Sequence, residues 1–77
     1  MAMVISLDEL PVGTQARVLS LEHTGPIRRR LADLGLISGA VVQCVGVSPM
    51  GDPHAYLICG AVIALRLCDC KKILVLR

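Results

Sequence analysis

The C-terminal half of the chain consists of short aliphatic runs that alternate with turn-forming segments. The runs AVVQCVGV, AYLIC, VIALR and ILVLR each have the length of a β-strand, and the first is rich in β-branched residues. Between them, SPMGDPH predicts a hairpin loop, GA predicts a tight two-residue connection, and LCDCKK predicts a short polar turn or one helical turn. This half of the chain therefore predicts four short strands.

The N-terminal half adds one or two strands to this set. ARVLSLE alternates, with Val18 and Ser20 on one face and Leu19 and Leu21 on the other, and MVI predicts a further short strand. SLDEL predicts a single helical turn. A small sheet in so short a chain must close on itself to hide its edges. The sequence thus predicts a mainly β fold, a small SH3-like barrel of five or six short strands with one α-helix and one or two short helical turns.

The segment TGPIRRRLADLG predicts that one α-helix. Pro26 suits the first helical position, where its missing N–H costs nothing. Gly35 suits the left-handed residue after the last turn, and Leu36 then folds back on Leu31. We therefore expect the helix to end at Gly35.

The apolar residues of this helix fall on one face. Ile27, Leu31 and Leu34 are spaced at i, i+4 and i+7, so we expect them to be buried together. At about 100° per residue, Arg29 points nearly opposite that face. The arginines before and after it flank the apolar stripe.

Composition limits both the core and the kind of partner. A chain of 77 residues has room for one domain, and its 27 Leu, Ile and Val residues, without Phe or Trp, predict an aliphatic core. Eight basic residues against six acidic ones is close to balance. The overall charge therefore does not steer the chain toward nucleic acid or anionic lipid.

The sequence also predicts a cytoplasmic location. MAMVISLDEL has no basic n-region and meets two acidic residues early, so we expect no signal peptide. The longest uncharged run, Leu34 to Gly51, is interrupted by glycines, a proline, serines and Gln43, which excludes a membrane span.

Residues suited to catalysis are sparse. No serine has a nearby histidine in the sequence, the carboxylates are scattered, and no glycine-rich phosphate loop precedes a helix. We therefore expect no catalytic residues and no enzymatic activity.

Four cysteines raise the question of a metal site. Without an export signal we expect Cys44, Cys59, Cys68 and Cys70 to be reduced, and their apolar contexts favour packing as small hydrophobes. A structural zinc site needs two ligand pairs at set spacings, and only one C-x-C pair is present. We predict no metal ligand and no cofactor. Weak binding of ferrous iron or zinc, with Cys68, Cys70 and His54 as candidate ligands, is the alternative.

The three consecutive arginines admit more than one interpretation. On a helix they spread over about 200°, so they form no single stripe for nucleic acid. Tyr56 is the only aromatic residue, whereas single-stranded nucleic acid and proline-rich peptides require aromatic platforms. Composition alone favours a solvated helix face whose long arginine stems cover the rim of the core. The alternative is that the arginines form a binding surface for a partner protein.

Several motifs occur together and in order along the chain. They are an L-x-x-L-x-x-G opening at Leu7, Leu10 and Gly13, the segment RRRLADLGLISG, a P-x-GDP loop and a G-x-x-IALR strand. In this combination the chain closely resembles the FeoA family, the small cytosolic component of bacterial ferrous iron transport. The resemblance implies that residues 1–77 form a single FeoA-like, SH3-like domain.

The resemblance further implies a non-enzymatic accessory or regulatory protein for ferrous iron uptake. Its expected partner is the cytosolic GTP-binding part of a membrane ferrous iron transporter, so contact with the membrane is indirect and no nucleic acid is expected. Weak self-association is left open. On this view Arg28, Arg29 and Arg30 become the expected partner-binding surface. Cys70 departs from the family, where a small residue such as Ala is more usual, and this leaves a metal or redox role open.

A related module forms the C-terminal domain of some metal-dependent repressors. The alternative function is therefore an SH3-like module of a metal-dependent transcriptional regulator, or a metal-sensing binding domain. Because no DNA-binding segment precedes the motifs, we expect the accessory role.

Overall fold

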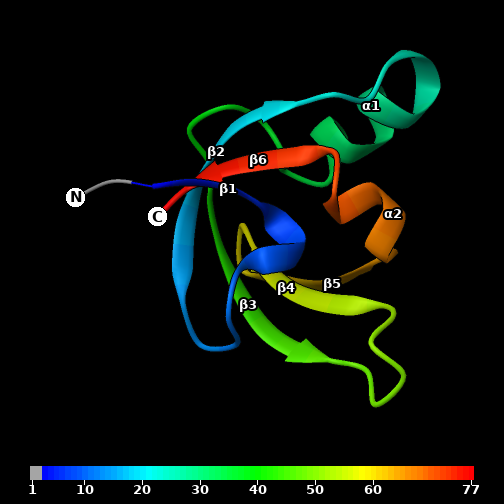
Figure 1. Cartoon of the computed structure of the whole chain (residues 1–77). Coiled ribbons are helices and arrows are strands. Elements are labelled where there is room, and N and C mark those ends of the chain that lie inside the picture. The colour runs from blue at the N-terminus through cyan, green and yellow to red at the C-terminus, as the bar shows by residue number, and fades with distance from the viewer. Residues whose placement is uncertain (1–2) are drawn as a thin grey trace.

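The computed structural model describes residues 3–77, which form six antiparallel strands in one sheet, a main helix and two short helical turns (Figure 1). In chain order the elements are β1 (Val4–Ser6), η1 (Leu7–Glu9), β2 (Gln15–Leu21), α1 (Gly25–Asp33), β3 (Val41–Val47), β4 (His54–Ile58), β5 (Ala61–Leu65), α2 (Leu67–Cys70) and β6 (Ile73–Leu76). The predicted number of strands and helical segments is confirmed.

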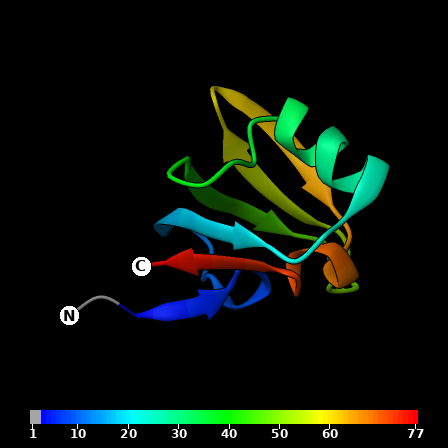
Figure 2. The same cartoon turned by 90° about the horizontal axis from the view of Figure 1, so that it is seen from above.

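The sheet has the strand order β1-β6-β2-β3-β4-β5, and it is strongly curled (Figure 2). Strands β1, β6 and β2 form one part of it, and β3, β4 and β5 bend over that part. The short turns η1 and α2 contact each other beside the curled sheet. Helix α1 lies against the other side, near β5 (Figure 2).

The core is aliphatic, as the composition predicts, with one aromatic ring and two thiols added. Tyr56, Cys44 and Cys70 are fully buried. Cys59 and Cys68 are exposed, so the expectation that all four cysteines pack inside is wrong for these two. The remaining buried apolar side chains are Leu7, Leu10, Ala16, Val18, Leu21, Leu31, Leu36, Val42, Ile58, Leu65, Ile73 and Val75.

Strand β2 departs from the simple alternation that its sequence suggests. Val18 pairs with Val75, but the register then shifts, so that Ser20 rather than Leu19 pairs with Leu74. An extra residue of this kind reverses which side chains face inward beyond it. Leu21 is therefore buried together with Val18, and the predicted shared face of Val18 and Ser20 is wrong.

The β4–β5 turn lies one residue earlier than predicted. Its two central residues are Cys59 and Gly60, with φ angles of 51° and 80°, rather than Gly60 and Ala61. A two-residue hairpin turn of this twist needs left-handed backbone at both positions, which Gly adopts without cost. Ala61 pairs with Ile58 and is the first residue of β5.

The end of α1 follows the prediction. Gly35 has φ 101°, its N–H donates to the carbonyl of Ala32, and the Leu36 N–H donates to the carbonyl of Leu31 at 3.0 Å. These two bonds define a Schellman ending, in which the left-handed residue turns the chain back. Leu36 is consequently buried beside Leu31.

The packing around Gly35 also leaves little room for a side chain. A Cβ on this residue would lie 2.7 Å from Cys59 Sγ and 3.1 Å from Ile58 Cγ2. The end of α1 therefore rests directly on the β4–β5 turn, and this contact sets the distance between the helix and that hairpin.

The predicted buried face of α1 is only partly correct. Leu31 is 5% exposed, but Ile27 is 50% and Leu34 is 37% exposed. The three side chains do share one side of the helix, since all of them line the same groove. Leu31 alone reaches the core, because the helix stands off from the sheet at both of the other positions.

Substitution of Gly35 tests the close approach of α1 to the hairpin. Gly39→Ala is the matched control, because Gly39 also has a left-handed φ but no atom within 4 Å of a Cβ. We expect Gly39→Ala to lower the free energy of unfolding by about 1 kcal/mol and Gly35→Ala by a further ~1–3 kcal/mol, through overpacking. Equal midpoints of urea unfolding for the two variants would contradict the assigned contact.

Truncation of the leucines tests which of them belongs to the core. We expect Leu31→Ala to cost about 2–5 kcal/mol because it leaves a cavity in a small core. Leu34→Ala should cost about 1 kcal/mol or less, and Arg29→Ala should stay within about 0.5 kcal/mol, because both side chains are exposed. Denaturant melts of the three variants give the ranking, and a loss for Leu34→Ala as large as that for Leu31→Ala would overturn it.

Candidate partner-binding surface

The three consecutive arginines of α1 have different surroundings. The Arg28 guanidinium donates hydrogen bonds to the carbonyls of Leu21, at 2.7 Å, and His23, at 3.4 Å. Both carbonyls belong to the end of β2 and the connection that follows it. Arg28 therefore ties α1 to the sheet, and its expected contact with a partner stays a prediction.

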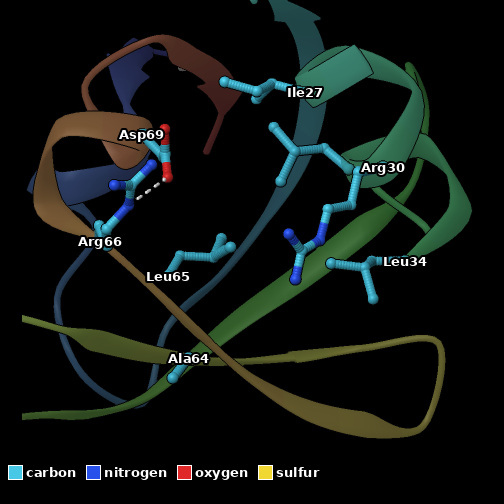
Figure 3. Close-up of a pocket in the computed structure, with 8 residues that line it drawn as sticks. Ile27, Arg30, Leu34, Ala64, Leu65, Arg66 and Asp69 are labelled. Carbon is cyan, nitrogen blue, oxygen red and sulfur yellow. Dashed lines mark hydrogen bonds and ion pairs between the residues drawn. The ribbon is translucent and has the colours of Figure 1, made fainter.

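Arg29 and Arg30 are the arginines of α1 that remain available for contact with a partner. Both are exposed, and within residues 3–77 neither guanidinium forms a hydrogen bond or an ion pair with another side chain. Arg29 lies on the outer side of the helix, as predicted from the helical period. Arg30 lies along the side of α1 that carries Ile27 and Leu34 (Figure 3).

A groove separates α1 from the edge of the sheet, and we refer to it as the α1–β5 groove (Figure 3). Its volume is about 350 Å³. Helix α1 forms one wall, and the end of β5 with the start of α2 forms the other. The lining residues are Ile27, Arg30, Leu31, Leu34, Ala64, Leu65, Arg66 and Asp69.

Asp69 joins the wall formed by β5 and α2 to the connection that precedes α1. Its Oδ1 lies 3.3 Å from Nε2 of His23, which precedes α1, and its Oδ2 accepts a hydrogen bond from Arg66 Nε at 3.2 Å (Figure 3). His23 is 5% exposed, and its Nδ1 has no partner within residues 3–77. This pairing joins the connection before α1 to α2 across 46 residues of sequence.

A second buried polar group lies deeper in the fold. The Tyr56 hydroxyl donates to the Leu7 carbonyl at 3.1 Å and lies 3.0 Å from His54 Nδ1. Because the hydroxyl has one proton, His54 must donate to it through Nδ1–H. The Cys70 thiol is beside this hydroxyl, and burial raises the pKa of both Tyr56 and Cys70, that of Cys70 to about 11.

The candidate metal ligands do not meet in the structure. Cys68 is exposed whereas Cys70 is buried, so the two thiols of the C-x-C pair point in different directions. The Nδ1 atom of His54 is engaged with Tyr56. Within residues 3–77 no three His, Cys, Asp or Glu side chains are grouped so that they could hold one metal ion. These side chains therefore do not fit a metal centre, and a metal-free protein stays a prediction.

The residues of the second wall of the groove carry no functional signal in the sequence. Ala64, Leu65 and Arg66 belong to the IALR segment, whose pattern predicts only a strand, and Asp69 is one of the scattered carboxylates. Nothing in their spacing signals that they face a helix more than 30 residues earlier in the chain. Only the curl of the sheet brings them there.

A small curled antiparallel sheet of this kind is an SH3-like domain. A crystal structure of Stenotrophomonas maltophilia FeoA complexed with zinc, described as a procaryotic SH3 domain protein, aligns with a TM-score of 0.79 at 35% identity, over 92% of this chain and 88% of that one. Residues 5–77 match the FeoA domain, and the chain belongs to the FeoA family. Both the SH3-like fold and the resemblance seen in the sequence are confirmed.

Two further relatives agree with this assignment. The solution structure of FeoA from Chlorobium tepidum aligns with a TM-score of 0.87 at 35% identity, covering 92% of this chain and 68% of that chain. A fusion protein of Porphyromonas gingivalis (strain ATCC BAA-308 / W83), which joins Fe(2+) transport protein A to Fe(2+) transporter FeoB, is 35% identical over 67 residues. The match covers 87% of this chain and only 8% of the fusion protein.

Structural neighbours of lower identity include a manganese-dependent transcriptional repressor, with a TM-score of 0.83 at 16% identity. At that identity the likeness shows a shared fold alone. Among residues 3–77, none of the helices has the length and apolar character needed to cross a membrane.

Thiol labelling tests the different surroundings of the cysteines. We expect iodoacetamide to alkylate Cys59 and Cys68 in the native protein and to spare Cys44 and Cys70, because alkylation requires an accessible thiolate. At neutral pH the raised pKa of Cys70 keeps its thiol protonated, and the thiolate forms only as the pH rises toward about 11. Peptide mass spectrometry after short labelling gives the rates. Equal rates at Cys68 and Cys70 would show that Cys70 is not buried.

Proposed function

We propose that this protein is a non-enzymatic accessory protein of ferrous iron uptake, which acts by binding the cytosolic part of a membrane ferrous iron transporter. The observation that carries the proposal is the relative in which the matching segment is fused to Fe(2+) transporter FeoB. Two proteins that function together gain effective concentration when they are joined in one chain. A separate chain of the same family then has to find its transporter through a binding surface.

The exposed residues of α1 support such a surface. Arg29 and Arg30 are exposed cations without a carboxylate partner within residues 3–77, and Ile27 and Leu34 add exposed aliphatic surface on the side of the helix that carries Arg30. Arginine next to apolar surface is a common composition for protein interfaces, because its planar group both pairs with carboxylates and stacks. The GTP-binding portion is the expected cytosolic target, and the proposal places the protein in the cytoplasm.

Metal sensing receives less support. The relative from S. maltophilia is complexed with zinc, but the candidate ligands Cys68, Cys70 and His54 of this chain do not converge. A role in a transcriptional regulator rests on fold alone. The interaction with a transporter is therefore the function that we propose.

Charge reversal on α1 tests the proposal. In the variant Arg29→Glu/Arg30→Glu we expect binding to the purified cytosolic portion of the ferrous iron transporter to weaken by about tenfold, mostly through a slower association rate. The matched control is Lys71→Glu/Lys72→Glu, which makes the same change in net charge at exposed residues outside α1 and the groove. Surface plasmon resonance at two salt concentrations measures both variants.

The outcomes separate specific contact from general electrostatic attraction. The control should bind within about twofold of wild type, since isolated surface charges contribute little. Equal losses of binding in both variants would show that net charge, and not a specific contact of α1, promotes the interaction. Unchanged binding of the α1 variant would place the contact elsewhere, and failure of the wild-type protein to bind would refute the proposed function.

A further inference from the structure

Strand β5 leaves one side of its backbone unpaired. It is the last strand of the sheet order, and among residues 3–77 it pairs only with β4. Next to a two-residue turn, Ile58 and Ala61 form the hydrogen-bonded pair, so Ile63 and Leu65 also bond to β4. The N–H and C=O groups of the alternate residues, Val62 and Ala64, therefore point outward, and within residues 3–77 no other element accepts or donates to them.

This edge lacks the features that usually protect an open strand. Natural edge strands are kept from pairing by short length, charged side chains, proline or a bulge. The opposite edge, β1, is short, with three residues. Strand β5 has five residues, AVIAL, without a charge or a proline, and its pairing with β4 shows no shift of register.

The open edge faces the α1–β5 groove. Ala64, one of the two residues with outward backbone groups, lines the groove opposite α1 (Figure 3). The other wall offers Ile27 and Leu34, which are 50% and 37% exposed. The helix thus stands beside the edge without covering it, and an added strand would have an apolar wall to pack against.

The charges around the groove indicate what the added segment carries. Two arginines, Arg30 and Arg66, and one carboxylate, Asp69, line it. Asp69 is already paired with Arg66 and with His23. Arg30 is left as the cation without a carboxylate within residues 3–77, so an acidic side chain complements the groove.

We propose that β5 binds an extended segment of the partner protein as an additional β-strand, with alternate aliphatic side chains in the α1–β5 groove and a carboxylate on Arg30. Main-chain hydrogen bonds to Val62 and Ala64 supply affinity, and the groove supplies selectivity. This inference rests on the proposed function, because the partner is the cytosolic part of the transporter.

Substitution at Ala64 tests the strand pairing. Ala64→Pro removes the outward N–H and obstructs the edge, while β4 keeps its bonds, because the Ala64 N–H does not pair with β4. The control, Val62→Thr, keeps the outward N–H and nearly the same side-chain volume at an exposed position outside the groove lining. We expect Ala64→Pro to weaken binding of the purified cytosolic portion of the transporter by about tenfold or more and Val62→Thr to stay within about twofold.

Amide hydrogen exchange on the wild-type protein gives a second measurement, which stands even if Ala64→Pro does not fold. We expect the amides of Val62 and Ala64 to exchange rapidly in the free protein and to become protected in the complex, whereas Ile63 is protected in both. Binding that leaves both amides unprotected overturns the strand pairing while the proposed function survives. Protection of both amides in the free protein, together with a dimer in analytical ultracentrifugation, would make a second copy the occupant and overturn the proposal. Absence of any binding by wild type refutes the proposed function itself.

Discussion

The position of α1 depends on the contact of Gly35 with the β4–β5 turn. At this residue the chain is left-handed, and a Cβ would force the side chains of Cys59 and Ile58 to shift. The beginning of the helix is held by different forces, through Arg28 on the Leu21 carbonyl and through the pairing of His23 with Asp69. Between these two attachments only Leu31 reaches the core, and Ile27 and Leu34 on either side of it stay partly exposed along the α1–β5 groove.

Elements were predictable where a local rule determined them. The four C-terminal strands, the loop at SPMGDPH, the turn of α2 and the Schellman end of α1 all follow from residue type and short-range spacing. Errors arose where the pairing between strands decided the outcome. The bulge near Leu19 is set by β6, and the exact turn residues after Ile58 are set by the twist of the hairpin.

The candidate site was predictable only on the helix. The period of α1 correctly placed Arg29 outward and grouped Ile27 with Leu31 and Leu34, but burial depends on what lies opposite, which a single helix cannot reveal. Arg28 shows the same limit, because its hydrogen bonds are made to carbonyls of a neighbouring segment. The opposite wall and the open edge of β5 come from sheet order, and strand order is not encoded in local periodicity.

Arg30 belongs to the exposed arginines of α1, and it also lines the groove beside the open edge of β5. Two kinds of interaction therefore operate on one continuous surface. Exposed charges such as Arg29 act over a distance of about 8–10 Å at physiological salt, so they chiefly raise the rate of encounter. Backbone groups of Val62 and Ala64 act only in contact, so they chiefly slow dissociation. A partner that uses both needs no deep pocket, which suits a 77-residue fold with a core too small to enclose one.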